Sequence, residues 1–204
     1  MKTKLISLSL AFLSIFSACQ TSIDELVEES TPSRFSFPER EDWVYLETNE
    51  ERYGALQIPE NLLTILSSQE LAEACMTYPL GSDCLFYNEY QMGIAHVVTH
   101  FNGFPELKKQ PDAFDKILDF YNKELNSIAK ITDKEEFLSR TFHLYYEEQF
   151  IISGYLMPVD QLKNYKKLID LYHKAEKLRK NNKELCGCTS LNSLDSMKEA
   201  LGLK

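Results

Sequence analysis

Along most of the chain after Tyr53, apolar residues recur every three or four positions, and polar residues fill the positions between them. This period places large side chains on one face of a helix. The clearest run begins at Pro111-Asp112, where Asp112 and Asp115 interact favourably with the positive end of a helix dipole. Its apolar positions are Phe114, Ile117, Leu118, Tyr121, Leu125 and Ile128. The pattern predicts an amphipathic helix over these residues.

Two capping boxes predict where further helices begin. Ser67 with Glu70, and Thr132 with Glu135, have the spacing at which the two residues satisfy each other's free backbone N–H groups. The first box predicts a helix up to Tyr78. The second predicts a long segment up to about Leu156.

Apolar spacing predicts four more helices, namely from Pro59 to Leu66, over Asn88–Asn102, from Pro158 to about Lys180, and over Leu194–Leu201. Gly103 is expected after the second of these as its C-terminal cap. After Tyr53, no alternating pattern of useful length indicates a strand. The sequence therefore predicts an all-α fold, with about six helices in a single compact domain over residues 43–204.

The N-terminus has the pattern of an export signal. A basic start, Met1–Lys4, precedes the apolar stretch Leu5–Phe16, which is too short to span a membrane as a helix. Phe16-Ser17-Ala18-Cys19 follows, and it resembles the cleavage site of a bacterial lipoprotein signal. That resemblance implies cleavage before Cys19, so that residues 1–18 are removed and the Cys19 thiol is lipidated. The alternative is an ordinary signal peptide that is cut near Ala18.

Residues 19–42 are expected to form the lipidated cysteine and a flexible tether. The segment is rich in Asp and Glu, contains Pro32 and Pro38, and has few large apolar residues to bury. We therefore expect an exported protein that a lipid holds in the bacterial cell envelope, at the outer membrane, facing the periplasm or the surface.

Composition narrows the class of protein. The 204 residues have a formal net charge of −9, with 22 Lys and Arg against 31 Asp and Glu, and 44% of them are hydrophobic. This hydrophobic content excludes a mainly disordered chain. The negative balance argues against a nucleic-acid partner, because phosphates require a basic face.

Several short segments between residues 53 and 125 resemble a known family. They are Tyr53–Glu60, Ser67–Glu70, Ala74–Leu80, Phe101–Leu107 and Pro111–Ala113. Together they are similar to a family of uncharacterised secreted proteins and lipoproteins of anaerobic bacteria. The resemblance implies an exported helical protein, and it assigns no activity and no functional residue.

His96 and His100 are the candidate metal ligands. Their i, i+4 spacing places both rings on one helical face. That face lies opposite Ile94, Val98 and Phe101, so we expect the two histidines to face solvent or a neighbouring protein. They are weak candidates, because no Glu follows the first His as it does in zinc peptidases. The alternative is two histidines on a polar face with no metal.

Four cysteines remain beside Cys19, and in an exported chain they can form disulfide bonds. Three pairings are open, and Cys75 can instead be a small buried hydrophobic residue. Cys186-Gly187-Cys188 lacks the spacing of a redox motif, so a structural role is favoured over a redox or zinc role. The four candidates are Cys75, Cys84, Cys186 and Cys188.

Glu147-Glu148 is the best candidate for acid–base chemistry, because aromatic residues surround this pair of carboxylates in the sequence. Adjacent residues on a helix diverge by about 100°, so a charged helix edge is the favoured interpretation. Some of the tyrosines can form a binding face instead of the core. They are Tyr45, Tyr53, Tyr87, Tyr90, Tyr145 and Tyr146.

The sequence contains no motif for a nucleophile, a phosphate loop, a dinucleotide or calcium, and it indicates no cofactor. We therefore expect a membrane-anchored lipoprotein that is not an enzyme and that binds a protein partner or helps an assembly in the cell envelope. One alternative is a cell-envelope hydrolase or ligand-binding protein with its site among the aromatics and Glu147/Glu148. Another is a metal-binding lipoprotein that uses His96 and His100.

Lipidation can be tested directly. Labelled palmitate is expected to enter the wild-type protein and not Cys19→Ala, because the thiol of Cys19 is the expected acceptor. Gel fluorography of the purified proteins measures the label. Equal labelling of both proteins would contradict a lipid anchor at Cys19.

Overall fold

A computed structural model describes residues 34–156, 162–186 and 192–203. The expected signal peptide, Cys19 and the first part of the expected tether lie outside the described residues. So do Pro158, at the expected start of a helix, and Cys188.

The all-α prediction is confirmed, since the described residues contain helices and no strand. Within these described ranges, six helices have nine residues or more, which agrees with the expected number. They are α4 (Ser68–Met76), α5 (Tyr90–His100), α7 (Ala113–Ile128), α8 (Lys134–Ile152), α9 (Leu162–Asn181) and α11 (Asn192–Ala200). The shorter helices are α1 (Arg40–Trp43), α2 (Asn49–Ala55), α3 (Glu60–Leu63), the 3₁₀ helix η1 (Gly81–Phe86), α6 (Gly103–Lys108) and α10 (Lys183–Cys186). Most of the short helices were not predicted, because they contain too few turns to show a period.

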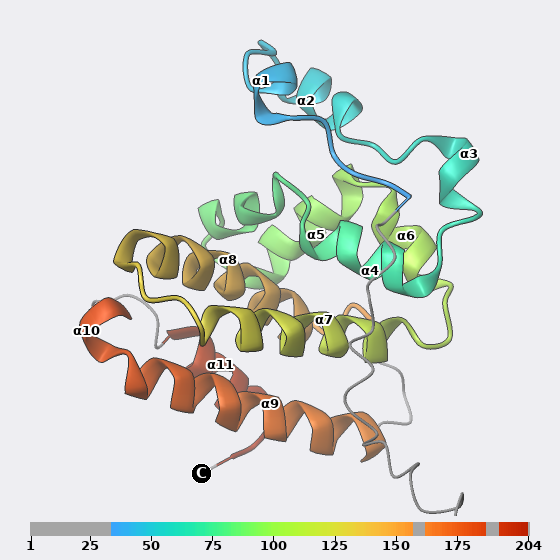
Figure 1. Ribbon diagram of the computed structural model, residues 1–204. Coiled ribbons are helices and arrows are strands. Elements are labelled where there is room, and N and C mark those ends of the chain that lie inside the picture. Colours follow the sequence, from blue (N-terminus) through green and yellow to red (C-terminus); the bar gives the residue numbers. More distant parts are fainter. Residues whose placement is uncertain (1–33, 157–161, 187–191, 204) are drawn as a thin grey trace, which may run out of the picture. The chain divides into compact units, whose positions relative to one another are not determined.

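The long helices pack in layers around α7 (Figure 1). This helix contacts α4 on one side and α9 on another, and it also packs against α8. Ile117, Leu118 and Tyr121, on the stripe that predicted α7, are all buried in these contacts. The amphipathic pattern therefore located the helix around which the body packs.

Helix α8 is buried on every side over its second half. All residues from Tyr146 to Ile151 are buried, including Glu147, Glu148 and Gln149. The expected charged helix edge at Glu147-Glu148 is therefore wrong. A helix enclosed by its neighbours has no polar face, and polar residues on it must be accommodated inside the body.

A buried ion pair joins α8 to α9. Arg179 donates a hydrogen bond to one carboxylate oxygen of Glu148 at 2.9 Å, and the hydroxyl of Tyr121 donates to the other at 2.6 Å. Both charged side chains are at most 2% exposed. Removing one partner of such a pair costs about 3–5 kcal/mol, because it leaves a buried charge uncompensated. The pair therefore fixes how α9 lies against α7 and α8.

The folded part begins earlier than the expected residue 43. Phe35 and Phe37 pack against the core, and the ring of Phe37 lies 5.5 Å from that of Phe101. Arg34 forms an ion pair with Glu70 at 2.8 Å. The hydrogen bond from Arg34 holds the pKa of Glu70 well below its usual range. From residue 34 onward, the segment that was predicted to be a flexible tether is instead attached to the body, because Phe35 and Phe37 pack against the core and Arg34 pairs with Glu70.

The capping predictions have different outcomes. The Ser67–Glu70 capping box is present at the start of α4. At α8, the N-cap is Asp133, whose carboxylate accepts a hydrogen bond from the Glu136 N–H at 2.8 Å, and Thr132 is not the cap. Asp and Thr are both good N-cap residues, and two adjacent glutamates let either one fit the pattern.

Gly103 begins a helix instead of ending one. It is the first residue of α6, and α5 ends at His100, after which Phe101 has extended backbone. A Cβ atom at Gly103 would lie 2.9 Å from Cζ of Phe101. Glycine is required here because this backbone packs directly on an aromatic ring. The reason is not a left-handed backbone conformation, such as a C-terminal cap would need.

Another glycine sets how closely α5 approaches η1. A Cβ atom at Gly93 would lie 2.8 Å from the carbonyl carbon of Cys84, and closer still to its oxygen. The two elements can therefore touch backbone to backbone only because residue 93 has no side chain.

Gly93→Ala should therefore destabilise the protein by at least about 1–3 kcal/mol, since the added methyl group must push η1 away from α5. Gly54→Ala is the matched control, because it lies in helix α2 with nothing within 4 Å of the new methyl group. The control should be stabilised by about 0.5–1 kcal/mol through its higher helix propensity. Urea unfolding measures both variants, and equal effects at the two positions would contradict the close approach at Gly93.

Candidate functional site

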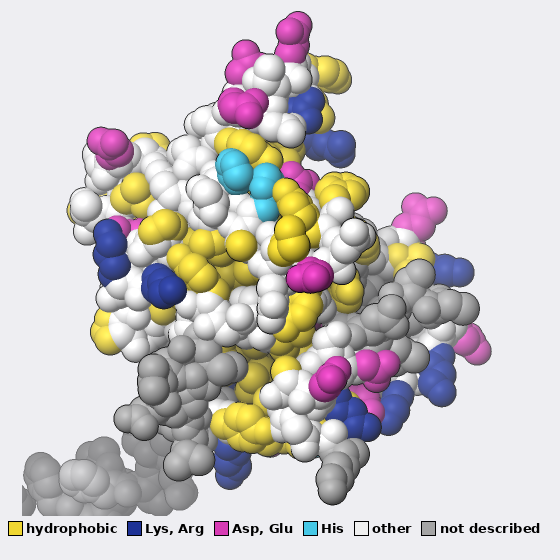
Figure 2. Space-filling model, turned by 180° about the vertical axis from the view of Figure 1, so that it is seen from behind, with side chains coloured by type: hydrophobic (Ala, Val, Ile, Leu, Met, Phe, Trp, Pro, Cys, Tyr) yellow, Lys and Arg dark blue, Asp and Glu magenta, His cyan; other side chains and the backbone are white. Residues whose placement is uncertain are grey.

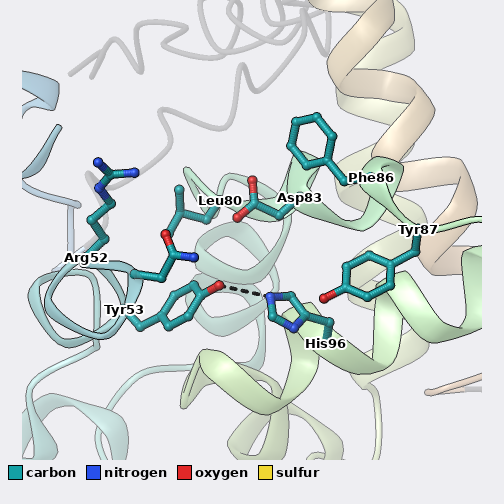
Figure 3. Close-up of a pocket in the computed structure, with 8 residues that line it drawn as sticks. Arg52, Tyr53, Leu80, Asp83, Phe86, Tyr87 and His96 are labelled. Carbon is teal, nitrogen blue, oxygen red and sulfur yellow. Dashed lines mark hydrogen bonds between the residues drawn. The ribbon is translucent and has the colours of Figure 1, made fainter. Parts of the chain in front are cut away.

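The candidate site is a pocket of about 400 Å³ between α2, η1 and α5 (Figure 3). Its lining combines aromatic rings with a carboxylate, a guanidinium and an imidazole. The lining residues are Asn49, Arg52, Tyr53, Leu80, Asp83, Phe86, Tyr87 and His96. Concave sites with a few convergent polar groups are the usual form of ligand sites in proteins.

Helix α2 presents three of these residues on one face. Asn49, Arg52 and Tyr53 have the i, i+3, i+4 spacing that aligns side chains along a helix. A capping box between Thr48 and Glu51 fixes the start of this short helix. The same pattern was present in the sequence, and it was the signal that could have identified Arg52 as a site residue.

Two side-chain amides attach α2 to the end of α5. The Gln57 side chain donates to the His100 carbonyl at 2.8 Å and accepts from the Asn102 N–H at 2.9 Å. The Asn102 side chain accepts from the Ile58 N–H at 3.0 Å and donates to the Ile58 carbonyl at 2.8 Å. We call these four hydrogen bonds the amide clamp. Gln57, Ile58 and Asn102 all belong to the segments that resemble the secreted-protein family, so the structure gives those segments a physical role.

His96 and His100 do not simply face solvent as expected. The Tyr53 hydroxyl and Nε2 of His96 form a hydrogen bond of 2.9 Å, and the two imidazole rings lie 4.2 Å apart. His100 donates from Nδ1 to the His96 carbonyl at 2.7 Å. The helical phase correctly separated these histidines from the main core stripe, but it could not show that α2 covers them.

The electrostatics of the pocket follow from partial burial. Burial lowers the pKa of His96, and His100 lowers it further, while Asp83 opposes the shift. Burial likewise raises the pKa of Asp83, against the opposing effects of His96 and Arg52. The site therefore favours an uncharged His96 beside a carboxylate that is partly removed from water.

Asp83 and Arg52 line the same pocket without forming an ion pair. In the part of the chain that the structure describes, no ion pair within 4.0 Å and no hydrogen bond involves the Asp83 carboxylate. Arg52 donates from Nε to the Leu46 carbonyl at 3.0 Å, which orients its guanidinium. Both charges therefore remain available to a ligand.

A metal site at His96 and His100 would require at least one further ligand from the protein. Among the described residues, no group of three or more His, Cys, Asp or Glu side chains is arranged to hold a metal ion. His96 already uses Nε2 in its hydrogen bond with Tyr53.

Glu147 and Glu148 lie away from the pocket, inside the helical body. Burial raises the pKa of Glu147 well above its usual value, and the charges of Glu124 and Glu148 add to this shift, while Arg140 opposes it. Neither carboxylate oxygen of Glu147 forms a hydrogen bond with another described residue. Glu148, by contrast, is held by Arg179 and Tyr121. The two carboxylates therefore differ in environment and do not converge on a substrate.

The tyrosines that were grouped as a binding face have separate locations. Tyr53 and Tyr87 line the pocket, and Tyr90 is partly exposed at the start of α5. Tyr146 is fully buried and donates to the Cys75 carbonyl at 3.0 Å, so it belongs to the core.

Cys75 and Cys84 are buried free thiols in this structure. Burial raises the pKa of the Cys84 thiol to about 12, and Asp83 adds to this shift. The expectation that Cys75 is a small buried hydrophobic residue agrees with its complete burial. The disulfide prediction for Cys186 and Cys188 concerns side chains that lie outside the described residues.

No protein-family model, curated protein sequence or solved structure matches this chain. Within the described residues, no helix combines the length and the apolar character that crossing a membrane requires.

Glu147 offers a test of the buried carboxylate. We expect Glu147→Met to stabilise the protein by about 1–3 kcal/mol at pH 7.5, because it removes a buried polar group that lacks a partner. The gain should be smaller at pH 4.5. Since the folded protein holds this proton more tightly than the unfolded chain does, stability of the wild type is lost as pH rises toward the raised pKa.

Urea unfolding at the two pH values measures this difference. The control is Asp170→Met, which replaces an exposed carboxylate in the middle of α9 and should change stability by less than about 0.5 kcal/mol at both values. A destabilised Glu147→Met protein would contradict the absence of a partner for Glu147.

Proposed function

We propose that this protein is an exported, lipid-anchored module of the bacterial cell envelope that binds a protein partner and does not act as an enzyme. The observation that carries the proposal is a run of exposed apolar side chains between η1 and the start of α5. Phe86 is 86% exposed and Met92 58%, and Tyr87 and Tyr90 are each 37% exposed. We call these four residues the aromatic surface.

The aromatic surface has the composition of a protein interface. Tyr, Phe and Met are enriched where proteins bind each other, and clustered exposed apolar residues mark such sites. The surface adjoins the pocket, because Phe86 and Tyr87 also line it. In Figure 2, hydrophobic side chains reach the surface next to histidine side chains.

The two alternatives have less support. A hydrolase that uses Glu147 and Glu148 would require these carboxylates to reach a substrate, and they are 1% and 0% exposed. The described pocket between α2, η1 and α5 is lined by one carboxylate, that of Asp83, whereas glycoside hydrolysis requires two. A metal-binding role would require a third ligand arranged with His96 and His100, and the residues that the structure describes contain no such set of three.

Site-specific photocrosslinking in intact cells tests the proposal. A photoreactive amino acid replaces Phe86 in one strain and Met92 in another, in the natively expressed lipoprotein. Ile65 is the control position, because it is 51% exposed but lies outside the aromatic surface. We expect the same envelope protein to be crosslinked from residues 86 and 92, and not from residue 65.

The captured protein is then purified and titrated against the soluble Cys19→Ala form. We expect Phe86→Ser to weaken binding by at least about tenfold, since central aromatic residues contribute most of the affinity of an interface. Ile65→Ser should bind as the wild type does. No crosslink at residues 86 and 92, or the same proteins captured from all three positions, would contradict the proposed function.

A further inference from the structure

We propose that the pocket between α2, η1 and α5 binds a small zwitterion, that is, a ligand with both an ammonium and a carboxylate group, such as a free amino acid or a dipeptide. This inference goes beyond the proposed function, which concerns the outward-facing aromatic surface and a protein partner. Its two charged groups, Arg52 and Asp83, are not part of that surface, although Phe86 and Tyr87 belong both to the surface and to the pocket lining.

The first argument is the pair of separated opposite charges. Arg52 and Asp83 both line the pocket, on different elements, and Figure 3 shows their charged groups apart from each other. Their charges are close enough to interact, because Arg52 acts on the pKa of Asp83. They nevertheless form no ion pair with each other within 4.0 Å. A zwitterion can satisfy both groups at once, with its ammonium at Asp83 and its carboxylate at Arg52.

The second argument is that the Arg52 guanidinium is positioned before any ligand binds. Its Nε donates to the Leu46 carbonyl, and the planar group keeps further N–H donors for a carboxylate. Because this orientation exists in the free protein, less entropy is lost when a ligand binds.

The third argument is the aromatic part of the pocket lining. Tyr53, Tyr87 and Phe86 supply aromatic rings, and the hydroxyl of Tyr53 is fixed by its hydrogen bond to His96. Aromatic rings attract an ammonium group through their electron-rich faces, and they also pack against an apolar side chain. A volume of about 400 Å³ lies within the range of pockets that enclose small organic molecules.

Ligands with a single charge fit the pocket less well. An anion would bind Arg52 while facing the Asp83 carboxylate, and a simple cation would bind Asp83 while facing the Arg52 guanidinium. Like charges placed together inside a partly desolvated site are unfavourable. The composition of the lining therefore selects for opposite charges on one small molecule.

Isothermal titration calorimetry of the full chain, purified in its soluble Cys19→Ala form, tests this inference. The probes are the twenty L-amino acids and a set of dipeptides, so that the two kinds of zwitterion are distinguished. Each compound that binds is compared with its C-terminal amide and with its N-acetyl derivative. We expect each derivative to bind at least about tenfold more weakly, because each lacks one of the two charges.

Substitutions then assign each charge to its residue. In Asp83→Asn, acetylation of the ligand should no longer weaken binding, and in Arg52→Gln, amidation should no longer weaken it. Arg52→Lys, which keeps the positive charge, should retain part of the effect of amidation. Asp42→Asn and Arg40→Gln in α1 change exposed charges outside the pocket and should bind as the wild type does.

Two outcomes would overturn the inference, namely that no compound of the panel binds, or that the same ligand binds Asp83→Asn and Arg52→Gln as it binds the wild type. Circular dichroism checks that the variants are folded. Failure here leaves the crosslinks from Phe86 and Met92 unaffected, so that it can be distinguished from failure of the proposed function.

Discussion

The arrangement of the candidate site depends on four hydrogen bonds from two amide side chains. Gln57 and Asn102 each bind backbone groups of the other's segment, so the chain after α2 is held to the end of α5 much as two strands are held together. Each amide provides both a donor and an acceptor, and thereby satisfies backbone groups that neither helix can satisfy by itself. These bonds act together with the burial of Leu56 and Ile58 and with the Tyr53–His96 hydrogen bond to hold α2, a helix of only seven residues, in place.

The amide clamp positions the side chains of α2 that line the pocket. It brings Arg52 and Tyr53 from α2 to face Asp83 of η1 and His96 of α5. The close approach of η1 and α5 at Gly93 completes the opposite wall. The body beneath, which α7, α8 and α9 form around the Glu148–Arg179 pair, supplies a rigid base. The site is thus made from short elements that a compact helical body holds in place, the common arrangement when function is carried on a rigid scaffold.

The sequence predicted the long helices well, because α4 and α7 have a cap or a period that repeats over several turns. It did not predict the short elements α2 and η1, which provide most of the pocket. The error at Glu147-Glu148 has a clear physical cause. Two adjacent carboxylates are typical of an exposed helix edge, and only the packing of helices on all sides of α8 shows that they are buried. For His96 and His100, helical phase gave their direction correctly, but which segment lies opposite them is a tertiary contact that no local pattern contains.

Amide hydrogen exchange at Ile58 and Asn102 tests the amide clamp most directly. In the wild type, both N–H groups should exchange far more slowly than in an unstructured peptide, because their acceptors are the side chains of Asn102 and Gln57. In Asn102→Ala the amide of Ile58 should lose this protection, and in Gln57→Ala the amide of Asn102 should lose it, because each substitution removes the acceptor of that N–H. The amide of buried Ile117 in α7 should keep its own protection in both variants. Unprotected amides at residues 58 and 102 in the wild type would contradict the account, since α2 would then not be held over η1 and α5.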